Sequence, residues 1–132
     1  MEVGRSLDRV DAYDKVTGRA KYTDDLRGSG ALVAKILHST IANGVVKSMD
    51  LSEAQAIPGV VKVLTCFDVP DIQYPTPGHP WSVEEAHQDV SDRKLLNRRV
   101  RIYGDDIAVV VAEDELTAER ALRAIRVEYE EY

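Results

Sequence analysis

The three histidines are the first candidates for chemistry, because imidazole binds metals and exchanges protons near neutral pH. They are His38, His79 and His87, and no two of them are four residues apart, the spacing of a helical metal-binding pair. His38 ends an apolar segment, so we expect a hydrogen-bonded histidine in the core or at a sheet edge. His79 and His87 are expected to be solvated loop residues, with contact to a partner or ligand as the alternative.

The single cysteine, Cys66, could serve as a nucleophile if a helix N-terminus lowered its pKa. It follows the apolar run Val60–Leu64 and begins a predicted helical turn, but no base lies near it in the sequence. We therefore expect a small buried residue. One cysteine also excludes an internal disulfide and a cysteine-rich zinc site.

Glycine pairs and carboxylate pairs give no stronger indication of a catalytic site. Gly28-Ser29-Gly30 precedes a predicted strand, whereas a phosphate-binding loop follows a strand and opens a helix. The doublets Asp24-Asp25 and Asp105-Asp106 lie in predicted turns, where carboxylates are usually hydrated and unsuited to acid–base catalysis. No catalytic, cofactor-binding or metal-binding residue is predicted in the chain.

A basic stretch is the remaining candidate. It has five positive charges and no negative one, at Arg93, Lys94, Arg98, Arg99 and Arg101. Such a stretch could receive an acidic partner surface or a phosphate, although a solvated strand face is the simpler interpretation. Partner docking is predicted for Arg98, Arg99, Arg101 and Trp81.

Composition limits the classes of protein to which the chain can belong. It has 132 residues, 23 acidic and 17 basic ones, and a net charge of −6, which argues against a nucleic-acid binder. Its apolar runs are too short to cross a bilayer, and no apolar segment near Met1 resembles a signal peptide. We expect a cytoplasmic protein without a membrane or nucleic-acid partner.

The elements that position these residues are mostly strands, because Val and Ile together number 24 against 8 aromatic residues. Strands are predicted at Ala20–Thr23 (short), Ala31–His38 (central), Val45–Met49, Val60–Leu64, Arg99–Tyr103, Ile107–Ala112 and Val127–Tyr129. A helix capped by Asp50 is predicted over Leu51–Ile57, and a second one follows the cap Asp114. The second helix has an apolar stripe at Ala118, Ala121, Leu122 and Ile125, and the strand Ile107–Ala112 is predicted to be fully buried. From residue 31 on, the order is β-β-α-β-β-β-α-β, an α+β fold with a mostly antiparallel sheet. Residues 70–92 form a long loop with four of the five prolines.

Several ordered segments resemble the start of the molybdenum-cofactor-binding large subunit of the xanthine dehydrogenase/aldehyde oxidase family. The similar segments are Arg9–Ala12, Lys15–Leu26, Asp50–Ala54, Pro58–Val60, Val63–Pro70, Val100–Ala112 and Val127–Glu130, together with Ala118 and Ala121. The chain departs from the family pattern at Ser39–Gly44, which lacks the usual proline and histidine, and at Asp106, where the family usually has proline.

The resemblance implies that residues 1–132 are one α/β-hammerhead domain, the N-terminal part of a longer subunit. In the family the molybdopterin-binding groups and the catalytic glutamate lie further along the chain, so this segment would be scaffold and inter-domain contact and would be inactive alone. The complete enzyme would hydroxylate a purine with water as oxygen source. Alternatives are an aldehyde or another N-heterocycle as substrate, or a non-catalytic interaction module.

The resemblance also implies cofactors and partners outside this segment. Molybdenum–molybdopterin would lie in the complete subunit, and iron–sulfur clusters and FAD on partner domains or subunits.

Overall fold

The computed structural model describes residues 4–26, 28–75, 84, 86 and 90–132. The chain divides into two compact units, Met1–Ala31 and Leu32–Tyr132. The first unit contains the helix α1 (Ala12–Val16) and the 3₁₀ helix η1 (Thr23–Leu26), and neither has a buried residue.

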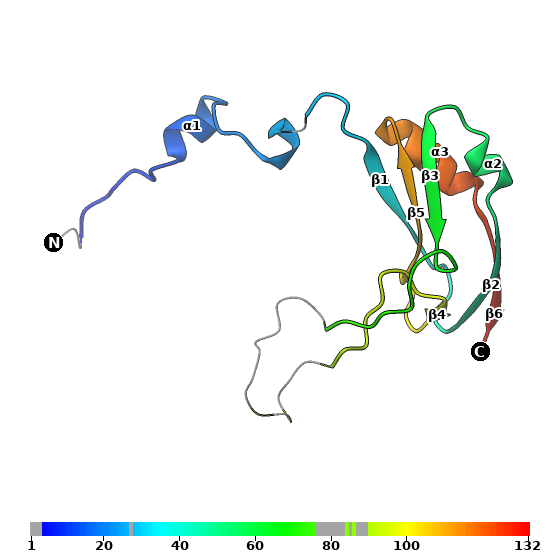
Figure 1. The fold of residues 1–132 in the computed structure, drawn as a ribbon. Coiled ribbons are helices and arrows are strands. Elements are labelled where there is room, and N and C mark those ends of the chain that lie inside the picture. The colour runs from blue at the N-terminus through cyan, green and yellow to red at the C-terminus, as the bar shows by residue number, and fades with distance from the viewer. Residues whose placement is uncertain (1–3, 27, 76–83, 85, 87–89) are drawn as a thin grey trace. The chain divides into compact units, whose positions relative to one another are not determined.

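The second unit contains two three-stranded antiparallel sheets (Figure 1). The first has the order β1-β5-β3, from β1 (Val33–His38), β5 (Asp106–Ala112) and β3 (Val60–Thr65). The second has the order β4-β2-β6, from β4 (Arg99–Val100), β2 (Gly44–Asp50) and β6 (Arg126–Glu131). From β1 on, the predicted order of strands and helices is confirmed.

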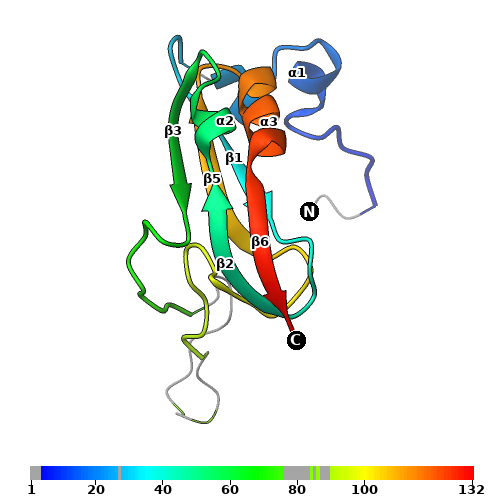
Figure 2. The ribbon, with the colours of Figure 1, turned by 90° about the vertical axis from the view of Figure 1, so that its right-hand side faces the viewer.

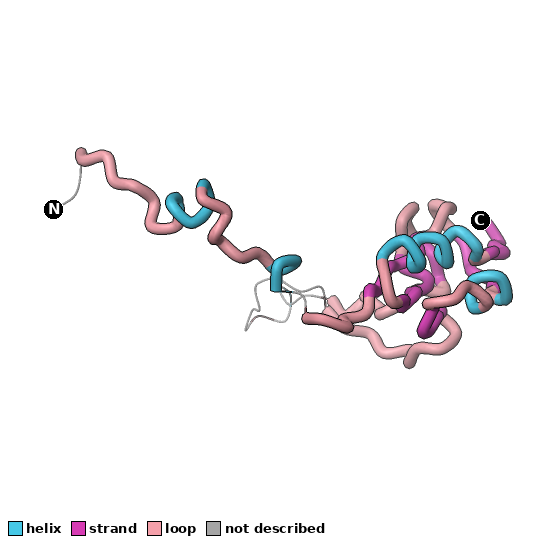
Figure 3. The backbone as a smooth tube through the Cα atoms, turned by 90° about the horizontal axis from the view of Figure 1, so that it is seen from above, coloured by secondary structure: helices cyan, strands magenta, loops and turns pink. Residues whose placement is uncertain are grey.

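Helix α3 (Glu115–Ala124) covers one face of the β1-β5-β3 sheet and also contacts the short helix α2 (Ser52–Gln55) (Figures 2 and 3). Its apolar stripe is the predicted one, and Ala118 and Ala121 are completely buried. They join Val63, Val110 and Ala112 of the sheet in the first hydrophobic cluster. A second cluster contains Ile41, Val46, Val100 and Ile107.

The central strand of the first sheet is β5, so the prediction that Ala31–His38 is central was wrong. Apolar residues on both faces of β1 suggested neighbours on both sides, yet this strand pairs only with β5. One face of β1 carries Val33 and Leu37 toward the first cluster, while Ile36 on the other face is 44% exposed. Apolar side chains on both faces therefore do not reveal how many strands are hydrogen-bonded to a strand.

The strand predicted over Arg99–Tyr103 ends at Val100. The backbone N–H groups of Arg101 and Ile102 donate to the carboxylate of Asp105, at 2.7 and 3.2 Å, instead of to a neighbouring strand. The Asp105 carboxylate thus takes the place of a neighbouring strand as the hydrogen-bond acceptor, and the chain turns toward β5.

Two other predicted elements do not form. At Ala20–Thr23 there is no strand; η1 forms instead, and the Asp25 carboxylate accepts a hydrogen bond from the Tyr22 N–H. After β3 the Asp68 carboxylate accepts from the N–H and hydroxyl of Thr65, which closes a turn rather than a helix.

The predicted helix caps differ in detail. Asp114 caps α3 as expected, and its carboxylate accepts from the Thr117 N–H at 2.8 Å. Helix α2 is shorter than predicted and its N-cap position is Leu51, but Asp50 still accepts from the Ser52 N–H.

The close approach of β2 and β6 depends on Gly44. A Cβ atom at this position would lie 2.3 Å from the Glu130 carbonyl oxygen, so only glycine fits. Glycine at position 44 is therefore a packing requirement of the second sheet.

The described ends of the 70–92 loop are joined near its base. Tyr74 and Arg93 form an isolated antiparallel bridge, with N–H to carbonyl distances of 3.0 and 3.2 Å. The Tyr74 hydroxyl also donates to the Lys94 carbonyl.

Candidate functional site: a cationic cleft

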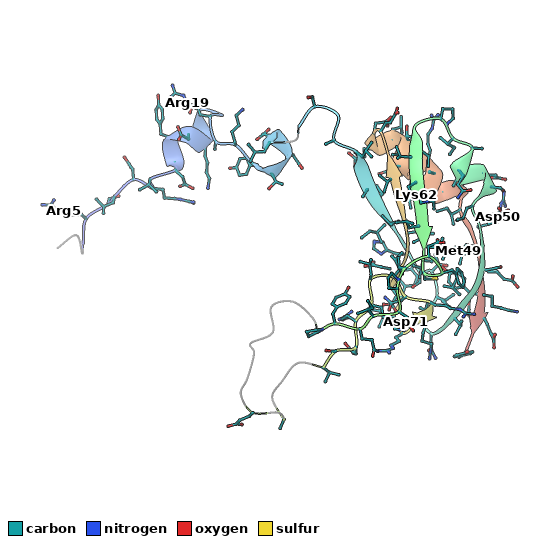
Figure 4. The ribbon with its side chains drawn as sticks, in the orientation of Figure 1. Arg5, Arg19, Met49, Asp50, Lys62 and Asp71 are labelled. Atoms are coloured by element: carbon teal, nitrogen blue, oxygen red, sulfur yellow. The ribbon has the colours of Figure 1, made fainter. Side chains whose placement is uncertain are left out.

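A cleft of about 490 Å³ lies in the second unit, between the turn that follows β3 and the segment that leads into β4. Its apolar lining is Val45, Cys66, Phe67, Val69, Pro70 and Leu96. Its charged lining is Asp71, Lys94, Arg98 and Arg99. Asp71 is labelled in Figure 4, on the segment that continues from β3. Clefts of this volume are typical of binding sites for small ligands and side chains.

The turn after β3 fixes one wall of the cleft. Besides its bonds to Asp68, the Thr65 hydroxyl accepts from the Phe67 N–H at 3.2 Å. The bonds from Thr65 hold the pKa of the Asp68 carboxyl below its usual value. This turn presents the Phe67 ring, which is 46% exposed, to the cleft.

The backbone of β2 holds the two arginines of the opposite wall. Arg98 Nε donates to the Val46 carbonyl at 3.3 Å, and Arg99 Nη1 donates to the Gly44 carbonyl at 2.8 Å. The Arg98 guanidinium lies 5.3 Å from the centre of the Phe67 ring. Each guanidinium is therefore ordered by contacts within the domain.

Lys94 is paired with Asp71 across the cleft. The other two cations of the lining, Arg98 and Arg99, form no ion pair with a carboxylate among the residues that the structure describes. The cleft therefore has a local excess of two positive charges, on a chain whose net charge is −6.

Cys66 lines this cleft but is unsuited to nucleophilic chemistry. Burial raises the pKa of its thiol to about 11, and the nearby Arg98 lowers it by less than burial raises it. The group therefore remains a thiol near neutral pH. The predicted small buried residue is half-buried in the structure.

The predicted docking residues do not all lie together. Arg98 and Arg99 line the cleft, whereas Arg101 faces Asp92 at 3.7 Å and lines a separate hollow with Asn97 and Asp105. Trp81, like His79 and His87, lies outside the described residues. The contribution of Phe67 was missed, although a lone phenylalanine beside the cysteine of a turn was a possible signal.

His38 is the edge histidine that the sequence predicted. Its Nδ1 lies 2.9 Å from the Asp106 carboxylate, on an edge strand. Within the described ranges, no group of three His, Cys, Asp or Glu side chains could hold a metal ion.

Three of the four carboxylates in the doublets have structural contacts. Asp25 and Asp105 accept backbone N–H groups, and Asp106 pairs with His38. The Gly28-Ser29-Gly30 segment lies in the connection that precedes β1.

No helix among the residues that the structure describes is long and apolar enough to cross a membrane.

Comparison with known proteins identifies the fold and the family. Residues 17–132 match the family model described as "Aldehyde oxidase and xanthine dehydrogenase, a/b hammerhead domain". The xanthine dehydrogenase molybdenum-binding subunit of Escherichia coli O157:H7 is 50% identical over 123 residues, which are 93% of this chain and 16% of that protein. The nicotinate dehydrogenase large molybdopterin subunit of Eubacterium barkeri is 35% identical over 130 residues, or 98% of this chain and 28% of that one.

Solved structures agree with this match. Quinoline 2-oxidoreductase from Pseudomonas putida 86 has a TM-score of 0.81 and 35% identity, over all of this chain and 16% of that chain. CO dehydrogenase from Oligotropha carboxidovorans has a TM-score of 0.78 and 30% identity, over 98% of this chain and 15% of that chain. The chain spans about a sixth of the E. coli relative. It therefore belongs to the aldehyde oxidase and xanthine dehydrogenase family of molybdenum hydroxylases, and its fold is that family's α/β hammerhead.

Proposed function

We propose that residues 1–132 are the N-terminal hammerhead domain of a molybdenum hydroxylase subunit that hydroxylates a purine, with water as the oxygen source. The observation that carries this proposal is the 50% identity to a xanthine dehydrogenase subunit, against 35% to the nicotinate dehydrogenase subunit. The domain contributes scaffold and contacts, because side chains such as Asp68, Asp114 and His38 are committed to a turn, a helix cap and a sheet edge.

The cofactors of this proposal belong to other parts of the enzyme. Molybdenum–molybdopterin binds in the remainder of the subunit, and iron–sulfur clusters and FAD bind on partner domains or subunits. The enzyme acts in the cytoplasm. A second candidate substrate is another N-heterocycle, because nicotinate and quinoline enzymes are among the relatives. An aldehyde is a third, since the aldehyde oxidoreductase of Desulfovibrio desulfuricans has a TM-score of 0.78.

The test is to purify from its source cells the polypeptide that contains this sequence and to measure bound molybdenum and substrate oxidation. The expected result is molybdenum on that polypeptide and oxidation of xanthine with oxygen from labelled water. The 132-residue chain alone should carry no molybdenum. Stoichiometric molybdenum on the chain alone would overturn the scaffold role, and oxidation only of nicotinate or of an aldehyde would replace the purine.

The scaffold role includes docking through the basic stretch and the 70–92 loop, with Arg98, Arg99, Arg101 and Trp81 at the contact. Reversal of charge at Arg98 and Arg99 together should weaken assembly of the holoenzyme and leave the fold of the domain intact. Gel filtration of the purified enzyme measures assembly. Unchanged assembly in a folded variant would refute docking through these two arginines.

A further inference from the structure

The cationic cleft has three features that together indicate the chemistry of its ligand: a positive charge, two ordered arginines and an apolar lining. The first feature is the charge. Its lining has an excess of two positive charges on a negatively charged chain. Partners with acidic side chains are repelled by the domain as a whole and attracted at this place, which favours one orientation of approach.

The two arginines are ordered before any ligand arrives. The Val46 and Gly44 carbonyls hold Arg98 and Arg99, and the Arg99 guanidinium also lies 5.0 Å from the Tyr132 ring centre. Each guanidinium has five N–H donors, and the bonds to β2 use one nitrogen of each. A carboxylate can bind to the remaining donors without the cost of ordering two long side chains.

The rest of the lining is apolar. Phe67 and Leu96 are on it, and the Phe67 ring is 46% exposed. A volume of about 490 Å³ accepts one bulky apolar side chain together with flanking carboxylates. A free phosphate ion would use the cations only and would leave this apolar lining in contact with water.

We propose that this cleft binds an extended acidic peptide segment, with carboxylates on Arg98 and Arg99 and an apolar side chain against Phe67. The chemistry of the segment follows from the cleft; its location in the remainder of the same subunit rests on the function proposed above.

The experiment uses the 132-residue chain. Isothermal titration calorimetry measures its affinity for the blocked peptide Glu-Leu-Glu-Glu-Leu-Glu. The controls are the peptide with Gln in place of Glu, and inorganic phosphate. The acidic peptide should bind about tenfold more tightly than the Gln peptide and more weakly at high salt, whereas phosphate should not bind.

Two double variants test whether binding of the acidic peptide depends on the charges of Arg98 and Arg99 in particular. Arg98→Gln with Arg99→Gln should weaken binding of the acidic peptide about tenfold, as expected for the loss of two charge-assisted contacts. Arg120→Gln with Arg123→Gln makes the same charge change on exposed α3 positions and should have no effect. Circular dichroism confirms the fold of each variant. The variant Phe67→Ser removes the aromatic ring and so tests the apolar contact independently of the arginines.

Three outcomes would overturn the proposal: equal affinity for the Glu and Gln peptides, binding of phosphate but not of the Glu peptide, or undiminished affinity in the folded Arg98/Arg99 variant. The first would indicate a merely apolar groove and the second a simple anion site. None of these outcomes involves molybdenum or substrate, so failure here is distinguishable from failure of the proposed enzymatic role.

Discussion

Ser39 is a buried hydroxyl, 1% exposed, that organises the approach to β5. Its Oγ accepts from the N–H groups of Gly104 and Asp105, at 3.2 and 3.1 Å, and donates to the Ile102 carbonyl at 3.2 Å. One side chain thus satisfies three backbone groups of a segment more than 60 residues away. Ser39 and the Asp105 carboxylate together determine the shape of the 101–105 turn.

Replacement of Ser39 by Ala should therefore destabilise the domain although the change removes a single atom. Each of the two backbone donors loses one acceptor but keeps a backbone carbonyl, that of Ser39 for Gly104 and that of Ile102 for Asp105. The expected loss is therefore that of ordinary hydrogen bonds, about 0.5–1.5 kcal/mol for each one. Urea unfolding followed by circular dichroism measures the loss. Ser48→Ala is the matched control, since Ser48 is exposed and bonds only the side chain of Glu128; equal effects of both changes would contradict the role of Ser39.

The side-chain hydrogen bonds that could be predicted from the sequence join residues that are close together in the chain. Asp114 caps a backbone N–H three residues on, and this spacing is visible in the sequence itself. Ser39 and Arg98 act on carbonyls 63 and 52 residues away, and no pattern within a short window carries that information. Partner choice over such distances is decided by the tertiary fold.

At the scale of elements, α3 depends on its N-terminal cap. The Thr117 N–H and hydroxyl bind the Asp114 carboxylate and lower the pKa of this group from its ordinary value of 3.8. Because the pKa of Asp114 is lower in the folded chain than in the unfolded chain, its carboxylate stabilises the fold at pH values above the unfolded pKa. This contribution is lost as the pH falls through the folded pKa.

Asp114→Ala should therefore destabilise the domain at neutral pH, and the difference between wild type and variant should shrink below about pH 4. Thermal unfolding from pH 7 to pH 2 measures this difference. Glu113→Ala is the control, because Glu113 precedes the cap. A difference that stays constant down to pH 2 would mean that the charge of Asp114 contributes nothing.

The pairing of β2 with β6 depends on Gly44. Gly44→Ala places a Cβ against the Glu130 carbonyl, and forced contacts of this kind cost about 1–3 kcal/mol or more. Gly28→Ala is the control, because a Cβ at Gly28 would meet no atom within 4 Å. A Gly44→Ala variant with wild-type stability in urea would show that the two strands separate at little cost.

Periodicity and capping residues predicted where most strands and the helices α2 and α3 lie, but not which elements are their neighbours. The buried run in β5 and the stripe in α3 are properties of consecutive residues, so both were predicted. The position of β1 at an edge and the early end of β4 depend on hydrogen-bond partners from other segments.

At the scale of the molecule, both hydrophobic clusters consist of residues from the second unit. A chain of residues 32–132 should therefore fold and unfold with nearly the same urea midpoint as the complete chain. A chain of residues 32–112, which lacks α3 and β6, is the control and should not fold, because it loses Ala118, Ala121 and Ile125. Loss of cooperative unfolding in residues 32–132 would contradict this independence.

The family could be recognised from the sequence because several ordered segments match it, while the cleft could not. Its lining comes from β2, the turn after β3 and the segment before β4, and only the fold brings these together. Arg98 and Arg99 were singled out by their charge, but their orientation by β2 carbonyls and the exposed Phe67 ring were not foreseeable.

Strand β5 contributes Val110 and Ala112 to the first cluster and Ile107 to the second, and Leu37 and Val127 contact both. Neither cluster can open without exposing apolar surface of the other, so the two melt as one cooperative unit. The backbone amides of β5 lie between two strands and should be released to solvent only by global unfolding. In native-state hydrogen exchange they should be the slowest group, with a protection free energy equal to that of unfolding.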